Sequence, residues 1–309
     1  MAVLVAIAAG VVGLGFARRR PAFVTAPSQP GRPLTQPASE APLLACLPKF
    51  VGEKLSFEFG WQGLGAKARI AAAKAEAEVV ERTVDGERQF VIQARAHTEG
   101  WVAALWKMND RVESVVDGNT FRVDRYVLEQ RENDDHTKTT VTFVPNSREA
   151  ITHKVRYHKP TDDPRRETES RRRRYSPLDP ASLAYAMRGA RVDSDRKDLE
   201  LAFFDGKYTF RIHAVPLGRE AITVKAGEFD ALKLKMRASD VDRPPKPGRK
   251  PKVIHAVLWV SSGPERIPLR LESETFVGQV YGELTDYTPP EKNRMEAGRG
   301  PAKEKMPAP

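Results

Sequence analysis

Apolar and polar residues alternate along most of the chain between residues 49 and 288, with the period of two that is typical of a β-strand lying on a core. In LELAFFDGKYTFRIHAV, residues 199–215, two alternating runs flank the pair Asp205-Gly206. Asp-Gly readily supplies the positive φ angles of a tight hairpin turn, and the same pair occurs at residues 85–86 and 117–118. The pattern predicts a mainly β fold, in which a long meander forms a single curved antiparallel sheet or a partly closed β-barrel.

Two segments within this pattern need an interpretation of their own. AKARIAAAKAEAEVVER, residues 66–82, is rich in good helix formers, but Lys74, Glu76 and Glu78 alternate strictly with apolar residues. We interpret it as a strand because of this alternation. In ERIPLRLE, Pro268 lacks the backbone donor that a sheet interior uses, so its strand is expected at an edge or to begin at a bulge.

One or two short helices are expected beside the strands, at residues 101–108 and at residues 181–188. The second follows PLDP, in which Asp179 can cap the helix and Pro180 can occupy its first position. Gly189 is expected to end it.

Residues 1–17 contain no charged residue and are followed at once by Arg18, Arg19 and Arg20. As a helix this run spans about 25 Å, a little less than a hydrocarbon core of about 30 Å. We therefore expect a signal peptide or an N-terminal membrane anchor. Because the charges follow the apolar run, either the true start lies upstream of Met1 or the segment is an uncleaved anchor. In the second case the positive-inside rule would leave the body in the cytoplasm.

Proline and small polar residues dominate both flanks of the alternating region. We predict a Pro/Ser-rich disordered linker at residues 18–48, an antiparallel β domain at residues 49–288, and a disordered tail at residues 289–309. Cys46, the only cysteine, ends LLAC, which resembles the lipid-attachment box of bacterial lipoproteins. No apolar run precedes it, so an ordinary linker thiol is the alternative.

Four phrases recur in an order that resembles a known family. They are GEKLSFEFGWQGLGAKARI (52–70), DPASLAYAMRG (179–189), GREAITVKAGEFDALKLKM (218–236) and LWVSSGPERIPLRLESETFVGQVYGEL (258–284). Together they resemble the bacterial envelope family catalogued as domain of unknown function 3108. The resemblance implies an exported protein, periplasmic or anchored in the cell envelope, that is mostly antiparallel β. The family brings no established catalytic residues with it.

A net charge of +10 and a pI near 9.7 favour partners that carry phosphate or other anionic groups. Two charged stretches, residues 159–175 and 242–252, are candidates for such contacts, with a solvated loop as the alternative for each. Nucleic acid is the less favoured partner, because acidic residues interrupt the first stretch and no aromatic residues alternate with its arginines. The candidate anion contacts are Arg171, Arg172, Arg173, Arg174, Lys246, Arg249 and Lys250.

Aromatic residues from several predicted strands are expected to converge inside the curved sheet. They either fill the interior as ordinary core or line an apolar pocket for a lipid-like ligand. The candidate pocket residues are Phe57, Phe59, Trp61, Trp101, Trp106, Tyr185, Phe203, Trp259 and Tyr281.

The sequence shows no recognisable catalytic arrangement. Its six histidines form neither an HExxH motif nor a paired Cys/His spacing, and no nucleophile with an adjacent base is evident. We therefore predict no cofactor, no metal and no enzymatic activity. Two roles stay open: a binding protein for a lipid or an anionic envelope polymer, and a structural or assembly protein that binds other envelope proteins.

Overall fold

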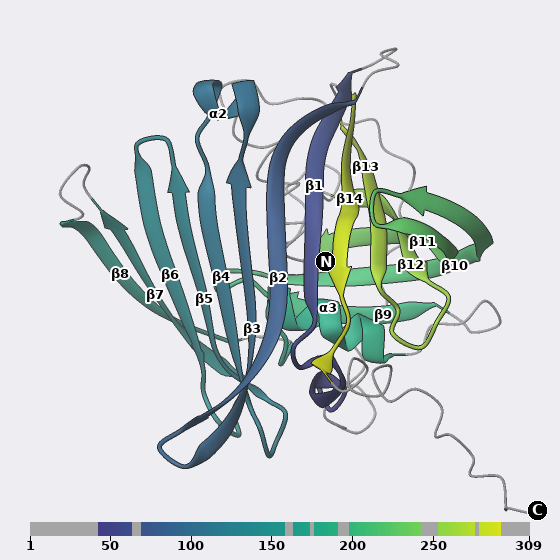
Figure 1. Cartoon of the computed structure of the whole chain (residues 1–309). Coiled ribbons are helices and arrows are strands. Elements are labelled where there is room, and N and C mark those ends of the chain that lie inside the picture. The colour runs from purple at the N-terminus through teal and green to yellow at the C-terminus, as the bar shows by residue number, and fades with distance from the viewer. Residues whose placement is uncertain are drawn as a thin grey trace, which may run out of the picture.

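The computed structural model describes residues 43–63, 69–157, 163–173, 176–190, 198–242, 253–275 and 278–291. Within these ranges fourteen strands form one antiparallel sheet, which confirms the predicted mainly β fold (Figure 1). In the same ranges three short helices accompany the sheet: η1, a 3-10 helix (Leu47–Phe50), α2 (Gly100–Leu105) and α3 (Pro180–Gly189). The strands are β1 (Lys54–Gly63), β2 (Ile70–Val84), β3 (Glu87–Thr98), β4 (Asn109–Asp117), β5 (Val123–Glu132), β6 (Asp135–Phe143), β7 (Glu149–Tyr157), β8 (Pro164–Arg173), β9 (Leu199–Phe204), β10 (Thr209–Val224), β11 (Gly227–Asp240), β12 (Val253–Ser261), β13 (Pro268–Thr275) and β14 (Gly278–Thr288).

The sheet consists of two meanders that meet along one pair of strands. Its spatial order is β8-β7-β6-β5-β4-β3-β2-β1-β14-β13-β12-β11-β10-β9, so the last strand of the chain returns beside the first. α3 lies between the meanders in the sequence. In the described part of the chain β8 and β9 form the two edges and do not pair with each other, so the sheet curves but does not close.

Strong curvature brings strands together that lie far apart in the sheet order. The turn between β9 and β10 packs on β6 and β7: Thr152 Oγ1 donates a hydrogen bond of 2.6 Å to the carbonyl oxygen of Gly206. A Cβ on Gly206 would lie 2.7 Å from Val141, so the turn fits there only with glycine. The largest fully buried side chains, Phe59, Phe90 and Phe204, come from both meanders. The core therefore lies between the two curled halves of one sheet.

The segment with conflicting signals is a strand, as predicted. β2 buries Ala73 and Ala75 and exposes Lys74 and Glu76, because successive side chains of a strand point to opposite faces. Its first predicted residues, 66–68, lie outside the described residues.

The three Asp-Gly pairs all lie in turns between strands, by different geometries. Asp85 and Gly86 have φ angles of 52° and 82°, which is the two-residue turn expected for such a hairpin. Gly206 also has a positive φ, of 95°. The pair at residues 117–118 differs: the Asp117 carboxylate accepts hydrogen bonds from the amides of Asn119 and Thr120, and Phe121 takes the left-handed conformation instead of the glycine.

α3 forms where it was predicted, and its sequence signals act as expected at the N-terminus. Asp179 accepts hydrogen bonds from the amides of Ala181 and Ser182 in a capping box, and Pro180 occupies the first turn. The helix ends at Gly189, as predicted, but without a left-handed cap, because this residue has no positive φ. A Cβ there would lie 2.8 Å from Cys46 Sγ, so close packing is the reason for this glycine.

α2 and Pro268 each differ from expectation in one respect. α2 ends at Leu105 and not at residue 108, because Met108 already pairs with Glu132 in an isolated β-bridge. Pro268 is the first residue of β13 and lies beside a register shift, which confirms the expectation that its strand begins at a bulge. β13 is an interior strand, however, so the alternative of an edge position was wrong.

The folded body extends beyond both predicted boundaries. Leu44 and Leu47 are buried, so the chain packs from residue 43 onward and not from residue 49. At the other end the Glu291 amide donates to the Val51 carbonyl oxygen. The predicted leader at residues 1–17, and the rest of the predicted linker and tail, lie outside the described residues. Among the helices that are described, none has the length and hydropathy to cross a bilayer.

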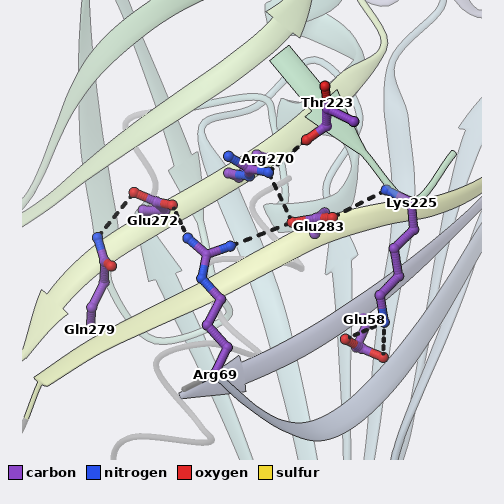
Figure 2. Close-up of polar contacts among 8 residues, drawn as sticks. All are labelled: Glu58, Arg69, Thr223, Lys225, Arg270, Glu272, Gln279 and Glu283. Atoms are coloured by element: carbon purple, nitrogen blue, oxygen red, sulfur yellow. Dashed lines mark hydrogen bonds and ion pairs between the residues drawn. The ribbon is translucent and has the colours of Figure 1, made fainter. Parts of the chain in front are cut away.

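A charged network fastens the β10–β11 hairpin to the sheet (Figure 2). Glu283 on β14 is its centre: one carboxylate oxygen accepts from the Lys225 amide at 3.1 Å, and the other accepts from Arg270 at 3.1 Å. The Lys225 ammonium lies 2.7 Å from Glu58 on β1, and Arg270 also donates to the carbonyl oxygen of Thr223 at 2.8 Å. The carboxylates and cations of this network balance, so it holds the hairpin in place without leaving a net charge. Its charged members are Glu58, Arg69, Lys225, Arg270, Glu272 and Glu283.

Candidate functional site

The predicted apolar interior contains a cavity of only about 60 Å³. Leu55, Phe57 and Ala75 line it on the sheet, and Ala184 and Tyr185 line it on α3. Pockets that bind small molecules usually measure about 300–1,000 Å³. The cavity therefore does not accommodate an acyl chain while α3 keeps this position.

Buried polar contacts hold α3 at both ends. At its N-terminus, Asp179 accepts from Ser114 of β4 at 2.5 Å in addition to its capping bonds. Burial raises the pKa of the Asp179 carboxyl to about 6, although these hydrogen bonds oppose the shift. At its C-terminus, Arg188 makes two hydrogen bonds of 2.5 and 2.7 Å with the fully buried Glu53. The guanidinium also stacks on Phe50, at 4.0 Å from the ring centroid.

Of the nine aromatic residues predicted to line a pocket, the structure brings only Phe57 and Tyr185 together at the cavity. Leu258 and Val260 line it from β12, so Trp259 between them faces the other side, where it donates to Glu220 at 2.6 Å. The other candidates lie elsewhere. Phe59 is fully buried in the core, Trp61 and Trp106 are half-buried, Trp101 is exposed, Phe203 stacks on Phe210, and Tyr281 lies under Arg69.

The arginine run predicted to contact anions is not a loop. Its described part lies on the edge strand β8, where Arg173 pairs with Glu149, Arg172 with Ala150 and Arg171 with Ile151. Consecutive strand residues point to opposite faces, so Arg172 cannot converge with its two neighbours on one ligand. Arg171 also forms an ion pair of 2.9 Å with Glu149. Arg174, Lys246, Arg249 and Lys250 lie outside the described residues.

A larger concavity lies on the opposite, polar face of the sheet. This polar groove has a volume of about 830 Å³ and crosses β14 and β1 to β6. At a strand spacing of about 4.8 Å, these seven strands extend over roughly 29 Å. Two neighbouring rows of directly paired residues form its floor. The first row is Asp286, Ser56, Glu76, Arg95, Arg111, Glu129 and Lys138, and the second is Thr288, Lys54, Glu78, Gln93, Glu113 and Val127.

Five of the ten charged residues that line the polar groove form ion pairs with described residues. Lys54 lies 3.4 Å from Glu78, and Arg125 lies 3.1 Å from Glu113. Glu129 contacts both Arg131, at 2.9 Å, and His136, at 3.1 Å. Glu129, one of the two carboxylates that flank the centre of the first row, is therefore engaged by other residues.

Arg95 and Arg111 occupy that centre. They are exposed and directly opposite each other on β3 and β4, and in the described part of the chain neither forms an ion pair or a side-chain hydrogen bond. Glu76 and Glu129 flank them in the row, but no oxygen of either comes within ion-pair distance of the two guanidinium groups. Like charges directly opposite each other destabilise a sheet. The pair therefore offers two adjacent guanidinium groups to an anion.

Sequence reasoning missed this arginine pair. Both residues stand at polar positions of predicted strands, which is the ordinary place for a solvent-facing arginine. The register between β3 and β4 brings the two arginines together: Arg95 pairs with Arg111, next to the pair formed by Ala96 and Asp110. The sequence does not encode that register in any local pattern.

A buried carboxylate, Asp110, is the strongest candidate for acid–base chemistry. Burial and the nearby charge of Glu132 raise the pKa of its carboxyl to about 7, while the Arg131 amide donates to it at 3.0 Å. Ser114, four residues farther along β4, is engaged with Asp179, so it is not a free nucleophile for Asp110. Across the described ranges, no three His, Cys, Asp or Glu side chains are grouped as a metal site.

An ordinary linker thiol was one expectation for Cys46, but the residue belongs to the folded body. Its thiol packs against the end of α3, with Sγ 3.4 Å from the Tyr185 carbonyl oxygen. Burial raises the pKa of the thiol. A raised pKa lowers the fraction of reactive thiolate, so the position favours a packing role.

One of three similar solved structures supports the fold. A beta-barrel-like protein of domain of unknown function DUF1849 from Brucella abortus aligns with a TM-score of 0.51 and 8% identity, over 78% of this chain and 98% of that chain. Two others align with TM-scores of 0.31. They are a provisionally assigned lipoprotein from Parabacteroides distasonis (12% identity, 78% and 96% coverage) and a provisionally assigned exported protein with a YmcC-like fold from Bacteroides fragilis (10% identity, 77% and 96% coverage).

The comparison with protein families covers most of the sheet. No curated protein matches the chain significantly. The family model described as Protein of unknown function (DUF3108) matches residues 56–285, which run from β1 to β14 and include α3 and most of the residues that line the polar groove. The chain therefore belongs to the DUF3108 family of proteins of unknown function.

Proposed function

We propose that the protein is a binding protein and not an enzyme, and that it holds an extended anionic polymer of the bacterial envelope in the polar groove. The observation that carries the proposal is the directly opposed, unpaired Arg95 and Arg111 at the centre of a groove of about 830 Å³. Export to the envelope is part of the proposal and is supported by the uncharged run at residues 1–17.

The chemistry of the arginine pair favours phosphate or carboxylate groups. A guanidinium presents its donors in a planar fork that matches either group with two parallel hydrogen bonds. A bound anion would also remove the repulsion between the two guanidinium groups. Because the groove continues over several strands on both sides of the pair, a chain-like ligand fits it better than a single small anion.

The alternative of a lipid in the apolar interior has less support. An acyl chain needs several times the existing cavity of about 60 Å³, so α3 would have to move away. That movement would break the contacts of Asp179 with Ser114 and of Arg188 with Glu53, and all four of these residues are buried. Separating a buried ion pair costs about 3–5 kcal/mol.

The alternative of an assembly protein depends on the open sheet edges. β8 is such an edge, but most of its residues are exposed and seven of them are charged. Charged side chains on an edge strand discourage pairing with another strand. The edge is therefore a weaker candidate for a binding site than the groove.

The first test is a calorimetric titration of the full-length chain with two polyanions, inorganic polyphosphate and polygalacturonate, at low and high salt. Arg95→Gln combined with Arg111→Gln should weaken binding by roughly a hundredfold, at about tenfold for each arginine. The two probes distinguish phosphate from carboxylate recognition.

Two further double variants serve as controls with the same change in net charge. Arg219 and Arg237 are exposed on the other meander, and their replacement by Gln should leave binding within about twofold. Replacement of Arg171 and Arg172 by Gln tests the edge strand. The groove proposal fails if the wild-type chain binds neither polymer, or if either control weakens binding as much as the groove variant does.

A further inference from the structure

α2 is an apolar helix that lies outside the core. Its sequence, GWVAAL, contains no charged or polar side chain, yet none of its residues is buried. Trp101 and Leu105, one helical turn apart, are 60% and 74% exposed. Residues three or four apart share a helix face, so these two side chains form one apolar patch. A helix that is hydrophobic all round is normally buried, which indicates that something covers this one.

The position of α2 limits what can cover it. The helix connects β3 to β4 and projects at one end of the sheet, whereas η1 and α3 lie toward the other end (Figure 1). Trp101 and Leu105 line neither the apolar cavity nor the polar groove. A flat fluid surface can receive such a projection, whereas a protein partner would need a matching depression.

The side chains around the patch are those of an interfacial element. Tryptophan combines a large apolar ring with an N–H donor and is enriched where membranes meet water. The flanking charged residues, Lys74, His97, Glu99 and Lys107, include both signs, and Lys74 lies 2.9 Å from Glu99. The acidic turn at residues 134–135 is also near, because the Lys107 amide donates to Asn133. Burial of apolar surface, and not net charge, is therefore the driving force.

We propose that α2 is a membrane-contact element that inserts Trp101 and Leu105 into the interfacial region of a lipid bilayer. The chain outside the structure supports this occupant. Residues 1–17 form an uncharged run, and the 25 residues 18–42 after it extend up to roughly 80 Å. The longest strands, of 15 and 16 residues, measure about 50 Å, so a body tethered at residue 43 can place its far end on the same bilayer. The inference uses the proposed envelope location but is independent of the groove.

The test measures the fluorescence of the full-length chain reconstituted with vesicles of phosphatidylethanolamine and phosphatidylglycerol that carry brominated acyl chains. Bromine quenches a tryptophan only at close range, and the other three tryptophans are half-buried or buried. We expect strong quenching in the wild-type chain, most of which is lost in Trp101→Phe because the reporting ring is removed. Leu105→Ser should weaken insertion of the remaining Trp101 by roughly tenfold.

Leu217→Ser is the matched control, because Leu217 is 53% exposed on β10. The proposal is overturned if wild-type Trp101 is not quenched, or if Leu217→Ser lowers the quenching as much as Leu105→Ser does. A photoreactive residue at position 105 tests the competing occupant: a lipid adduct in cells supports the proposal, and a protein adduct as the main product overturns it.

The two proposals can fail separately. The groove variant Arg95→Gln/Arg111→Gln should retain full Trp101 quenching, and Leu105→Ser should retain polyanion binding. A loss of both signals in either variant, with an unchanged circular dichroism spectrum, would contradict the independence of the two sites.

Discussion

Two buried carboxyl groups, Asp110 and Asp179, have raised pKa values for related reasons. Each lies inside the sheet, where removal from water disfavours the charged form, and the charge of Glu132 adds to this at Asp110. Both residues nevertheless accept hydrogen bonds from backbone amides, so they are useful to the fold in either protonation state. The unfolded chain has no such environment. Stability should therefore depend on pH through these two groups.

The expected sign follows from proton binding. Between pH 3.8 and about 6 the folded Asp179 holds a proton that the unfolded chain has released, so stability falls as the pH rises through this window. Asp179→Asn keeps a capping side chain but removes the charge. Relative to the wild-type chain it should gain up to about 3 kcal/mol of unfolding free energy by pH 7 and nothing below pH 3.8. Urea unfolding at a series of pH values measures this, and a constant difference across the series would contradict the assignment.

At the scale of single elements, α3 shows how a helix is placed by its ends. Its residues from Pro180 to Arg188 are all buried, so the helix fills the space between the two meanders. Apolar packing alone leaves a helix free to rotate or slide, whereas the contacts of Asp179 and Arg188 fix both ends to the sheet. The ion pair of Arg188 with Glu53 also joins α3 to the segment that precedes β1.

Loss of one partner of this ion pair should destabilise the fold, whereas replacement of both partners by apolar residues should not. Arg188→Met leaves the Glu53 charge buried without a partner, and we expect a loss of about 3–5 kcal/mol of unfolding free energy. Glu53→Leu in the same chain should restore much of that loss, since two apolar side chains need no desolvated charges. Urea unfolding of both single variants and the double variant forms the cycle. Equal destabilisation in the single and double variants would show that packing, and not the charge, matters here.

At the scale of the whole molecule, the open sheet keeps its shape through contacts between its halves. The network around Glu283 holds the β10–β11 hairpin against β14, next to the seam where the two meanders meet. Beside it, the Ala226 amide donates to the Leu284 carbonyl oxygen at 3.2 Å. The hairpin therefore has a backbone contact whose opening can be followed directly.

Glu283→Gln should loosen this hairpin without unfolding the sheet. The variant loses the charge that Arg69 and Arg270 contact and weakens the acceptor of the Lys225 amide, so we expect hydrogen exchange at the Ala226 amide to rise roughly tenfold. Glu272→Gln is the matched control, because Glu272 contacts Arg69 and Gln279 but not the hairpin. If both variants accelerate exchange equally, the hairpin is held by something other than Glu283.

Much of the fold was predictable from the sequence, because its signals are local. The alternation of residues 66–82 predicted β2, and Asp179 and Pro180 predicted the start of α3. The candidate site was not predictable in this way. Trp101 and Trp259 were both expected inside the curved sheet, yet Trp101 is exposed on α2 and Trp259 faces away from the cavity. The position of a residue within a helix or strand does not by itself show which face of that element packs on the core.

The sequence by itself determined most of the strands, where the chain turns and how one helix is capped, since each of these depends on residues a few positions apart. Only the tertiary structure decided that Arg95 meets Arg111, that β14 returns beside β1 and that the arginine run lies along an edge. These outcomes depend on the register between strands and on the curl of the whole sheet. Both are set by contacts between residues distant in the chain, which no short stretch of sequence contains.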